Sequence, residues 1–236
     1  MKRSILLPLI AVFLCVANLS KATSSANISG DQSEIINIVY VADRKYLPYT
    51  YTSLISVLEN SKYIERAEPI RFTIILDEME FKGILDDGMS KFLNAFFLAF
   101  NRNIYKYNIE YIPIPDIERE RISKFNSYWW PKSIFLKLSF SNFLPYKKCL
   151  YLDGDTICVS DIRELWIIDL EKYCFGACDH NIRHGALFYN AGVILMNLEK
   201  MREVGFASEV EKLVITGQET ENGISYSPTS YSPASY

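Results

Sequence analysis

The sequence lacks an excess of positive charge and a set of long apolar segments, and each absence excludes a class of protein. The 25 Lys and Arg residues are outnumbered by 28 Asp and Glu residues, which gives a net charge of −3. The basic residues are scattered, so no basic field is available to hold nucleic acid phosphates. Hydrophobic residues make up 49% of the chain and charged residues 22%, which is ordinary for a soluble globular domain and does not indicate a transmembrane bundle.

Histidine is also scarce, and the only two histidines follow two cysteines in one short run: Cys174, Cys178, His180 and His184. This run suggests a zinc site, but it lacks the longer middle segment that lets a structural zinc site fold around its ion. A disulfide or buried free thiols are the favoured interpretation. Cys149 and Cys158 are a second pair that a disulfide could join, and the sequence leaves the pairing open.

The two ends of the chain are expected to lie outside the folded domain. Residues 1–22 have a basic start, an apolar stretch too short for the ~20 residues of a spanning helix, and small residues at a cleavage position. They predict a secretory signal peptide or a short signal anchor that would associate the protein with a membrane. We therefore expect it in the secretory pathway (the endoplasmic reticulum or Golgi lumen, or secreted), or in the cell envelope of a bacterial host. Residues 23–34 are a polar linker, and the Tyr-Ser-Pro repeats of 216–236 predict a disordered tail.

Between these ends, apolar β-branched runs alternate with segments of helical periodicity. Strands are expected at 35–43, 70–78, 107–115 and 149–155, with helices at 51–61, 89–103 and within 129–142. A short strand at 173–179 and a strand that runs into a helix near Leu198 follow. This alternation predicts an α/β domain over 35–215, with a mostly parallel sheet whose strands open onto a ligand site at their carboxyl ends. Asp43 and Asp155 both fall at such ends.

The strand "CLYLDGD" ends in two carboxylates separated by one glycine. On an extended strand, Asp153 and Asp155 would point to the same side, and Gly154 would let the backbone turn closely around a ligand. A hard divalent cation would relieve their repulsion, and such a cation completes its shell with phosphate oxygens. The pattern is typical of a nucleoside diphosphate site. The alternative is an acidic loop at a strand end.

Three segments together resemble the family 8 glycosyltransferases, which are retaining enzymes of the GT-A fold. They are "VADRKY" with the following "SLISVLENS", the Asp-Gly-Asp strand with "DIRELW", and "YNAGVILMNLEKMR". The resemblance covers about Ile35 to Gly205. It implies a Rossmann-like sheet flanked by helices.

The resemblance also implies roles for individual residues. Asp43 and Tyr46 would contact the uracil of a UDP-sugar, while Asp153 and Asp155, with Gly154 between them, would hold Mn²⁺, or Mg²⁺ as the alternative, against the diphosphate. Asp179 and Asn190 fall where the family places groups that hold the donor sugar and the acceptor. A strand-end cap and a turn residue are the alternative interpretations of these last two.

The sequence departs from the family pattern in two places. The family usually has an Arg in the helix before the Asp-x-Asp strand, where this sequence has Leu136, with Lys132 and Lys137 as neighbouring cations. The family's C-terminal His-x-x-Gly-x-x-Lys-Pro-Trp motif and its Gln-Asp pair are not found, and His180 and His184 do not match them. We therefore expect a GT-A domain that is incomplete at its C-terminus.

The resemblance predicts a glycosyltransferase that moves a hexose or pentose from a UDP-sugar to a glycan, lipopolysaccharide or glycoprotein acceptor with retention. Because of the departures, the second interpretation is a catalytically dead sugar-nucleotide or carbohydrate-binding protein. A metal-dependent phosphatase is a weaker third, since nothing singles out a nucleophilic aspartate with a lysine partner.

Overall fold

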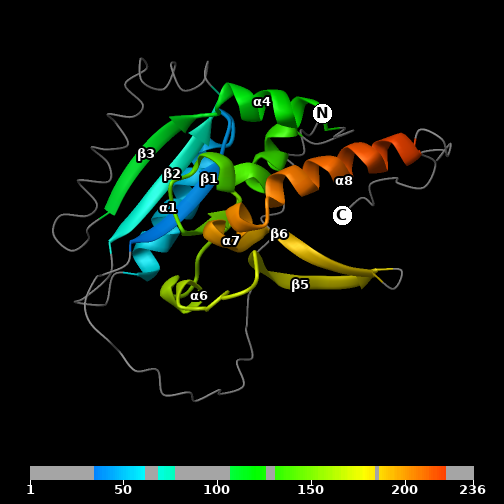
Figure 1. The fold of residues 1–236 in the computed structure, drawn as a ribbon. Coiled ribbons are helices and arrows are strands. Elements are labelled where there is room, and N and C mark those ends of the chain that lie inside the picture. Colours follow the sequence, from blue (N-terminus) through cyan, green and yellow to red (C-terminus); the bar gives the residue numbers. More distant parts are fainter. Residues whose placement is uncertain (1–34, 62–68, 78–106, 126–130, 184–185, 222–236) are drawn as a thin grey trace, which may run out of the picture. The chain divides into compact units, whose positions relative to one another are not determined.

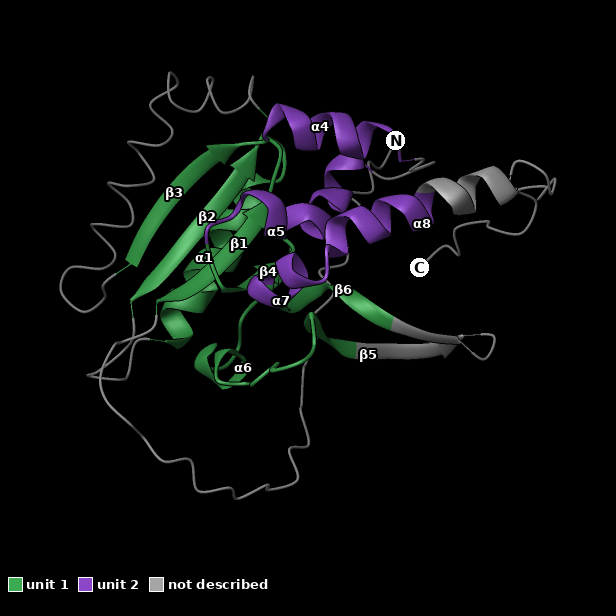
Figure 2. Ribbon diagram, in the orientation of Figure 1, with its two compact units in different colours: residues 1–114, 146–197 green, residues 115–145, 198–236 purple. Residues whose placement is uncertain are grey.

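The structure is a computed structural model that describes residues 35–61, 69–77, 107–125, 131–183 and 186–221, with only the main chain of 179–183, 186–188 and 215–221. The chain divides into two compact units (Figure 2). Unit 1 comprises residues 1–114 and 146–197, and unit 2 comprises residues 115–145 and 198–236. The predicted signal segment, the linker and the helix at 89–103 lie outside the described residues.

Unit 1 is built on a six-stranded sheet with the order β3-β2-β1-β4-β6-β5 (Figure 1). The strands are β1 (Ile36–Val41), β2 (Ile70–Leu76), β3 (Tyr107–Pro113), β4 (Lys148–Leu152), β5 (Phe175–Arg183) and β6 (Ala186–Asn197). The first four run parallel, while β6 is antiparallel to both β4 and β5. The predicted α/β class with a mostly parallel sheet is therefore confirmed.

The apolar runs form strands because both of their faces are buried. Ile38 and Tyr40 of β1 and Phe72 of β2 belong to the core cluster that also contains the apolar side of helix α1 (Leu47–Asn60), so the sheet packs against this helix. The helix begins earlier than the predicted 51–61, because the Leu47-Pro48 pair opens its first turn. Pro113 ends β3, an edge strand where a missing amide donor is tolerated.

The second half of the sheet differs in detail from the prediction. The "YCFGACD" strand extends to Arg183 and pairs with β6, which begins at Ala186 and runs through the Asn-Ala-Gly segment. The pairing register of β5 and β6 shifts on both sides of Asp179. A short helix, α6 (Arg163–Trp166), lies between β4 and β5 and buries Trp166 in the core of unit 1.

Unit 2 contains only helices among its described residues. They are α4 (Asp116–Ser123), the 3₁₀ helix η1 (Lys132–Ser139), α5 (Phe140–Phe143), α7 (Leu198–Glu203) and α8 (Phe206–Glu221). The predicted helix within 129–142 is thus a 3₁₀ helix followed by one α-helical turn. The helix predicted from Leu198 is two helices, since Gly205 has a φ of 64° and ends the first of them. The polar helix α4 was not predicted.

Two further features concern the chain ends and membranes. Helix α8 ends at Glu221, so it extends into the range 216–236 that the sequence assigned to a disordered tail. The boundaries of the predicted domain and of the flanking segments remain predictions. In the part of the chain that the structure describes, no helix is both long enough and apolar enough to cross a membrane.

Candidate active site

The candidate site lies at the carboxyl ends of β1 and β4, two neighbouring parallel strands between which the order of strands reverses. The chain passes from β1 to β2 on one side of β1, whereas β4 pairs with its other side, so the order of strands reverses between β1 and β4. Val39 is in register with Tyr151, which brings the carboxyl ends of both strands to the same edge. Asp43 follows β1 and Asp153 follows β4. Ligands of open α/β sheets bind at such an edge.

The Asp-Gly-Asp segment is a turn, and the expectation of an extended strand was wrong. Strand β4 ends at Leu152, and the Thr156 N–H then donates to the Asp153 carbonyl over 3.1 Å. The Thr156 hydroxyl donates to the same carbonyl over 2.8 Å. Within this turn Gly154 is buried against helix α1, where a side chain would not fit: a Cβ at Gly154 would lie 2.5 Å from Thr50 Oγ1.

Asp153 is held by residues of two strands. Its N–H donates to the Gly192 carbonyl of β6 over 2.8 Å, and its Oδ1 accepts a hydrogen bond from the Tyr151 hydroxyl. Its Oδ2 lies beside the Cα of Gly192, because a Cβ there would be 2.7 Å from this oxygen. Burial, followed by the charges of Asp153 and Asp155, raises the pKa of Tyr151, so the phenol remains a hydrogen-bond donor.

The same glycine brings Asn190 to Asp153. The Gly192 N–H donates to Asn190 Oδ1 over 2.7 Å, and this oxygen would be 3.2 Å from a Cβ at position 192. The amide oxygen of Asn190 and the carboxylate of Asp153 therefore border the space that a side chain at Gly192 would fill. The structure brings together these two predicted site residues from distant parts of the sequence.

A row of hydroxyl and amide side chains on α1 holds the turn, and this row was not predicted from the sequence. The Ser53 hydroxyl is 3.0 Å from both the Tyr40 hydroxyl and Thr156 Oγ1. One turn further along, Ser56 Oγ accepts from the Cys158 N–H over 2.8 Å, and Asn60 donates to the Cys158 carbonyl over 2.8 Å. The signal was present in the sequence as polar residues at helical spacing along one side of a helix: Thr50, Ser53, Ser56 and Asn60.

Asp43 and Tyr46 lie at the beginning of α1. Asp43 Oδ1 accepts the N–H groups of Lys45 and Tyr46, each over 2.8 Å, so this carboxylate shapes the first turn. The Tyr46 ring is about half exposed and lies 5.8 Å from the Tyr49 ring, which is equally exposed. Two accessible aromatic rings therefore stand at the helix end next to β1.

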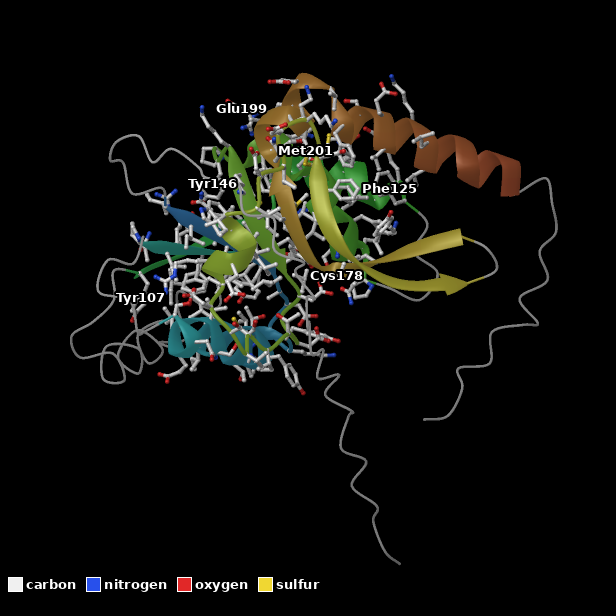
Figure 3. The ribbon with its side chains drawn as sticks, turned by 90° about the horizontal axis from the view of Figure 1, so that it is seen from below. Tyr107, Phe125, Tyr146, Cys178, Glu199 and Met201 are labelled. Carbon is white, nitrogen blue, oxygen red and sulfur yellow. The ribbon has the colours of Figure 1, made fainter. Side chains whose placement is uncertain are left out.

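Asp179 lies in β5 opposite Tyr189, and the structure describes its main chain but not its side chain. Among the described cysteines, Cys149, Cys158 and Cys174 are free thiols, and Cys178 (Figure 3) is exposed on β5. The bridge between Cys149 and Cys158 is not formed: Cys149 is buried within β4, and the Cys158 thiol donates to the Ser160 carbonyl. His184 lies outside the described residues.

The positions that depart from the family pattern lie in unit 2. Leu136 is fully buried within η1. The Lys132 ammonium donates to the Ser123 carbonyl at the end of α4. Within the described ranges, no three His, Cys, Asp or Glu side chains are grouped closely enough to hold a metal ion.

The donor set at the turn nevertheless fits a hard divalent cation. The carboxylates of Asp153 and Asp155 and the amide oxygen of Asn190 are oxygen ligands of the kind that Mg²⁺ and Mn²⁺ prefer. The glycine at 192 lets the oxygens of Asp153 and Asn190 come close together, because a Cβ there would lie 2.7 Å from Asp153 Oδ2 and 3.2 Å from Asn190 Oδ1. Two protein carboxylates are also the usual number where the remaining ligands come from water and phosphate.

Relatives with known sequences include proteins that are named as glycosyltransferases. A Haemophilus influenzae protein named "Putative glycosyltransferase" is 25% identical over 72% of this chain and 51% of its own length. General stress protein A of Bacillus subtilis is 21% identical over 83% of this chain and 71% of its own length. The chain thus spans about half the length of the Haemophilus relative.

Solved structures share the fold. A crystal structure of the galactosyltransferase LgtC in complex with donor and acceptor sugar analogues matches 76% of this chain and 66% of its own, with 22% identity and a TM-score of 0.53. The apo form of mouse xyloside xylosyltransferase 1 matches 80% of this chain and 76% of its own, with 15% identity and a TM-score of 0.58. These likenesses establish the GT-A fold.

The family model described as glycosyl transferase family 8 matches residues 37–227, a range that includes the Asp-Gly-Asp turn, the Asn-Ala-Gly strand and α1. This match extends over most of the chain. The chain belongs to glycosyl transferase family 8.

Proposed function

We propose that the protein is a glycosyltransferase that moves a hexose or pentose from a UDP-sugar to an acceptor with retention at the anomeric carbon. The observation that carries this proposal is the meeting of Asp153, Asn190 and Gly192 at the point where the strand order reverses. Family membership supports the transferase class. Retention and the UDP group are implied by the family resemblance.

The residues of the site divide into a nucleotide end and a diphosphate end. Tyr46 offers an exposed ring on which uracil stacks, and Asp43 lies at the turn beside it. Asp153 and Asp155 would hold the divalent cation, Mn²⁺ or Mg²⁺, and Asn190 Oδ1 lies next to Asp153 at Gly192. When bound, this cation supplies Lewis-acid stabilisation of the departing diphosphate.

The sugar end of the site involves β5 and β6. Asp179 and Asn190 belong to paired strands of one antiparallel hairpin, so a donor sugar or acceptor beside Asn190 is also near the main chain of β5. We propose a glycan, lipopolysaccharide or glycoprotein as the acceptor. The LgtC structure with donor and acceptor sugar analogues supports a sugar acceptor by analogy of fold. We further propose that the protein acts in the secretory pathway or the cell envelope.

The test is calorimetric titration of the protein with UDP, with and without Mn²⁺, in the wild type and in a variant that combines Asp153→Asn and Asp155→Asn. These substitutions keep the side-chain shape and remove two charges, so the variant should lose Mn²⁺-dependent binding. Glu164→Gln is the matched control, since it removes one exposed carboxylate of unit 1 on α6. Wild-type binding of UDP that is equal with and without Mn²⁺ would refute the metal-dependent donor site.

Transfer is tested separately from binding. Release of UDP from a panel of UDP-hexoses and UDP-pentoses, in the presence and absence of glycan acceptors, measures turnover. Metal-dependent binding without any release from the whole panel would favour the second function, a sugar-nucleotide binder.

A further inference from the structure

The buried phenol of Tyr151 contacts the first residue of the Asp-Gly-Asp turn. Tyr151 is the penultimate residue of β4, and Asp153 is the first residue after this strand. The Tyr151 side chain is almost fully buried, and its hydroxyl donates to Asp153 Oδ1. A buried phenol requires a hydrogen-bond partner, and here that partner is one oxygen of a site carboxylate.

The main chain and the second carboxylate oxygen of Asp153 contact Gly192 of β6. The Asp153 N–H is bonded to the Gly192 carbonyl, which fixes the position of its Cα. Oδ2 lies against the Gly192 Cα, where a side chain would collide with it. The bond from the Tyr151 hydroxyl holds one oxygen of the carboxylate, so it fixes the rotation of the carboxylate plane with the other oxygen next to Gly192 and Asn190.

Given the proposed function, on which this role rests, we propose that Tyr151 is a positioning residue for the metal-binding carboxylate. Its hydroxyl fixes the rotation of the Asp153 side chain so that Oδ2 is presented at the Gly192 and Asn190 edge. Loss of a group that orients a metal ligand in this way typically lowers metal affinity or activity about 10–100-fold. Tyr151 itself does not contact the donor.

A purely structural tyrosine would behave differently, and unit 1 contains one for comparison. Tyr146 (Figure 3) is also buried, and its hydroxyl also donates to a carboxylate, Glu110 Oε1, which accepts a second bond from Thr73 over 2.7 Å. Glu110 and Thr73 lie on β3 and β2, away from the turn after β4. Tyr146→Phe is therefore a matched control for Tyr151→Phe, since both variants remove one hydroxyl from a buried ring.

The experiment combines calorimetry with crystallography on the wild type, Tyr151→Phe and Tyr146→Phe. We expect Tyr151→Phe to weaken Mn²⁺-dependent UDP binding about tenfold, the size expected for loss of a ligand-orienting group. UDP binding without metal should not change, and Tyr146→Phe should match the wild type in both titrations. The crystal structure of Tyr151→Phe without ligands should show the Asp153 carboxylate rotated.

Two outcomes would overturn this role. One is an unrotated Asp153 carboxylate in Tyr151→Phe, and the other is equal weakening by both tyrosine variants, which would indicate a general loss of stability. If the wild type binds UDP without any dependence on Mn²⁺, the proposed function fails. The rotation of the carboxylate in the crystal still decides whether Tyr151 positions it.

Discussion

Substitution of Gly154 by alanine tests how closely the Asp-Gly-Asp turn approaches α1. The added Cβ would lie 2.5 Å from Thr50 Oγ1, about 0.9 Å closer than the 3.4 Å at which ordinary contact begins. Thr50 is fully buried, and its hydroxyl donates to the Tyr46 carbonyl over 3.1 Å, so it has little freedom to move. Overpacking of a tight core site costs about 1–3 kcal/mol, so we expect Gly154→Ala to lower the free energy of unfolding by about 2 kcal/mol.

The same geometry predicts a rescue. In Thr50→Ala the colliding oxygen is gone, and the nearest remaining Thr50 atoms, Cα and Cβ, are 3.5 Å from the new Cβ. The cost of Gly154→Ala in that background should therefore fall below about 1 kcal/mol, which gives a coupling energy within the range of roughly 0.5–3 kcal/mol seen for residues in contact. Thr50→Val keeps an atom in the place of Oγ1, so it should give no rescue.

Urea denaturation of the wild type, the three single variants and the two double variants measures this cycle. Each midpoint and slope yields a free energy of unfolding. Additive effects of Gly154→Ala and Thr50→Ala would refute the close approach of the turn to the helix. Equal rescue by alanine and valine would show that loss of the hydroxyl, rather than of the colliding atom, is responsible.

Two further predictions concern unit 1. Gly192→Ala places a Cβ 2.7 Å from Asp153 Oδ2, so calorimetry should show that Mn²⁺-dependent UDP binding is weakened at least about tenfold. Gly176→Ala is the control, because its Cβ meets only the end of a flexible side chain at 3.3 Å, and it should bind UDP as the wild type does. Burial and the hydrogen bond to Glu110 raise the pKa of Tyr146 from 10.0 to about 12. The native phenol thus keeps its proton between these values while the unfolded one loses it, and the free energy of unfolding falls as the pH rises through this window. Tyr146→Phe should reduce that fall by roughly 2 kcal/mol between pH 9 and 12 in urea denaturation, and an unchanged fall would contradict the assignment.

Much of the fold could be predicted because parallel strands with two buried faces are continuous apolar runs. The strands β1, β2 and β4 have this character, and each was found. Helix α4 was missed because its sequence, "DIERERIS", buries little besides Ile122 and Glu118 and therefore has no apolar period. The antiparallel direction of β6 depends on which strands it pairs with in the folded sheet, and a local sequence pattern cannot predict that pairing.

The candidate site could be predicted as a set of residues but not as a geometry. The carboxylates Asp153 and Asp155 were recognised from their spacing, yet the turn that holds them depends on the contact of Gly154 with Thr50, far away in the sequence. Serine and threonine within a helix are weak signals, so the hydroxyl of Ser53 could not be connected to the turn without the structure.

The strand order has a consequence for the synthesis of the chain. β6 follows the other five described strands in the sequence, but it lies between β4 and β5, and the described part of β5 pairs with no other strand. A nascent chain emerges from its N-terminus, so β1 to β4 can assemble while the edge of β4 stays open and β5 has no place in the sheet. An exposed strand edge is a template for aggregation, and chaperone protection would matter most in that interval. The bond from Asp153 to Gly192 closes only after β6 has joined, so the candidate site is among the last parts of the sheet to form.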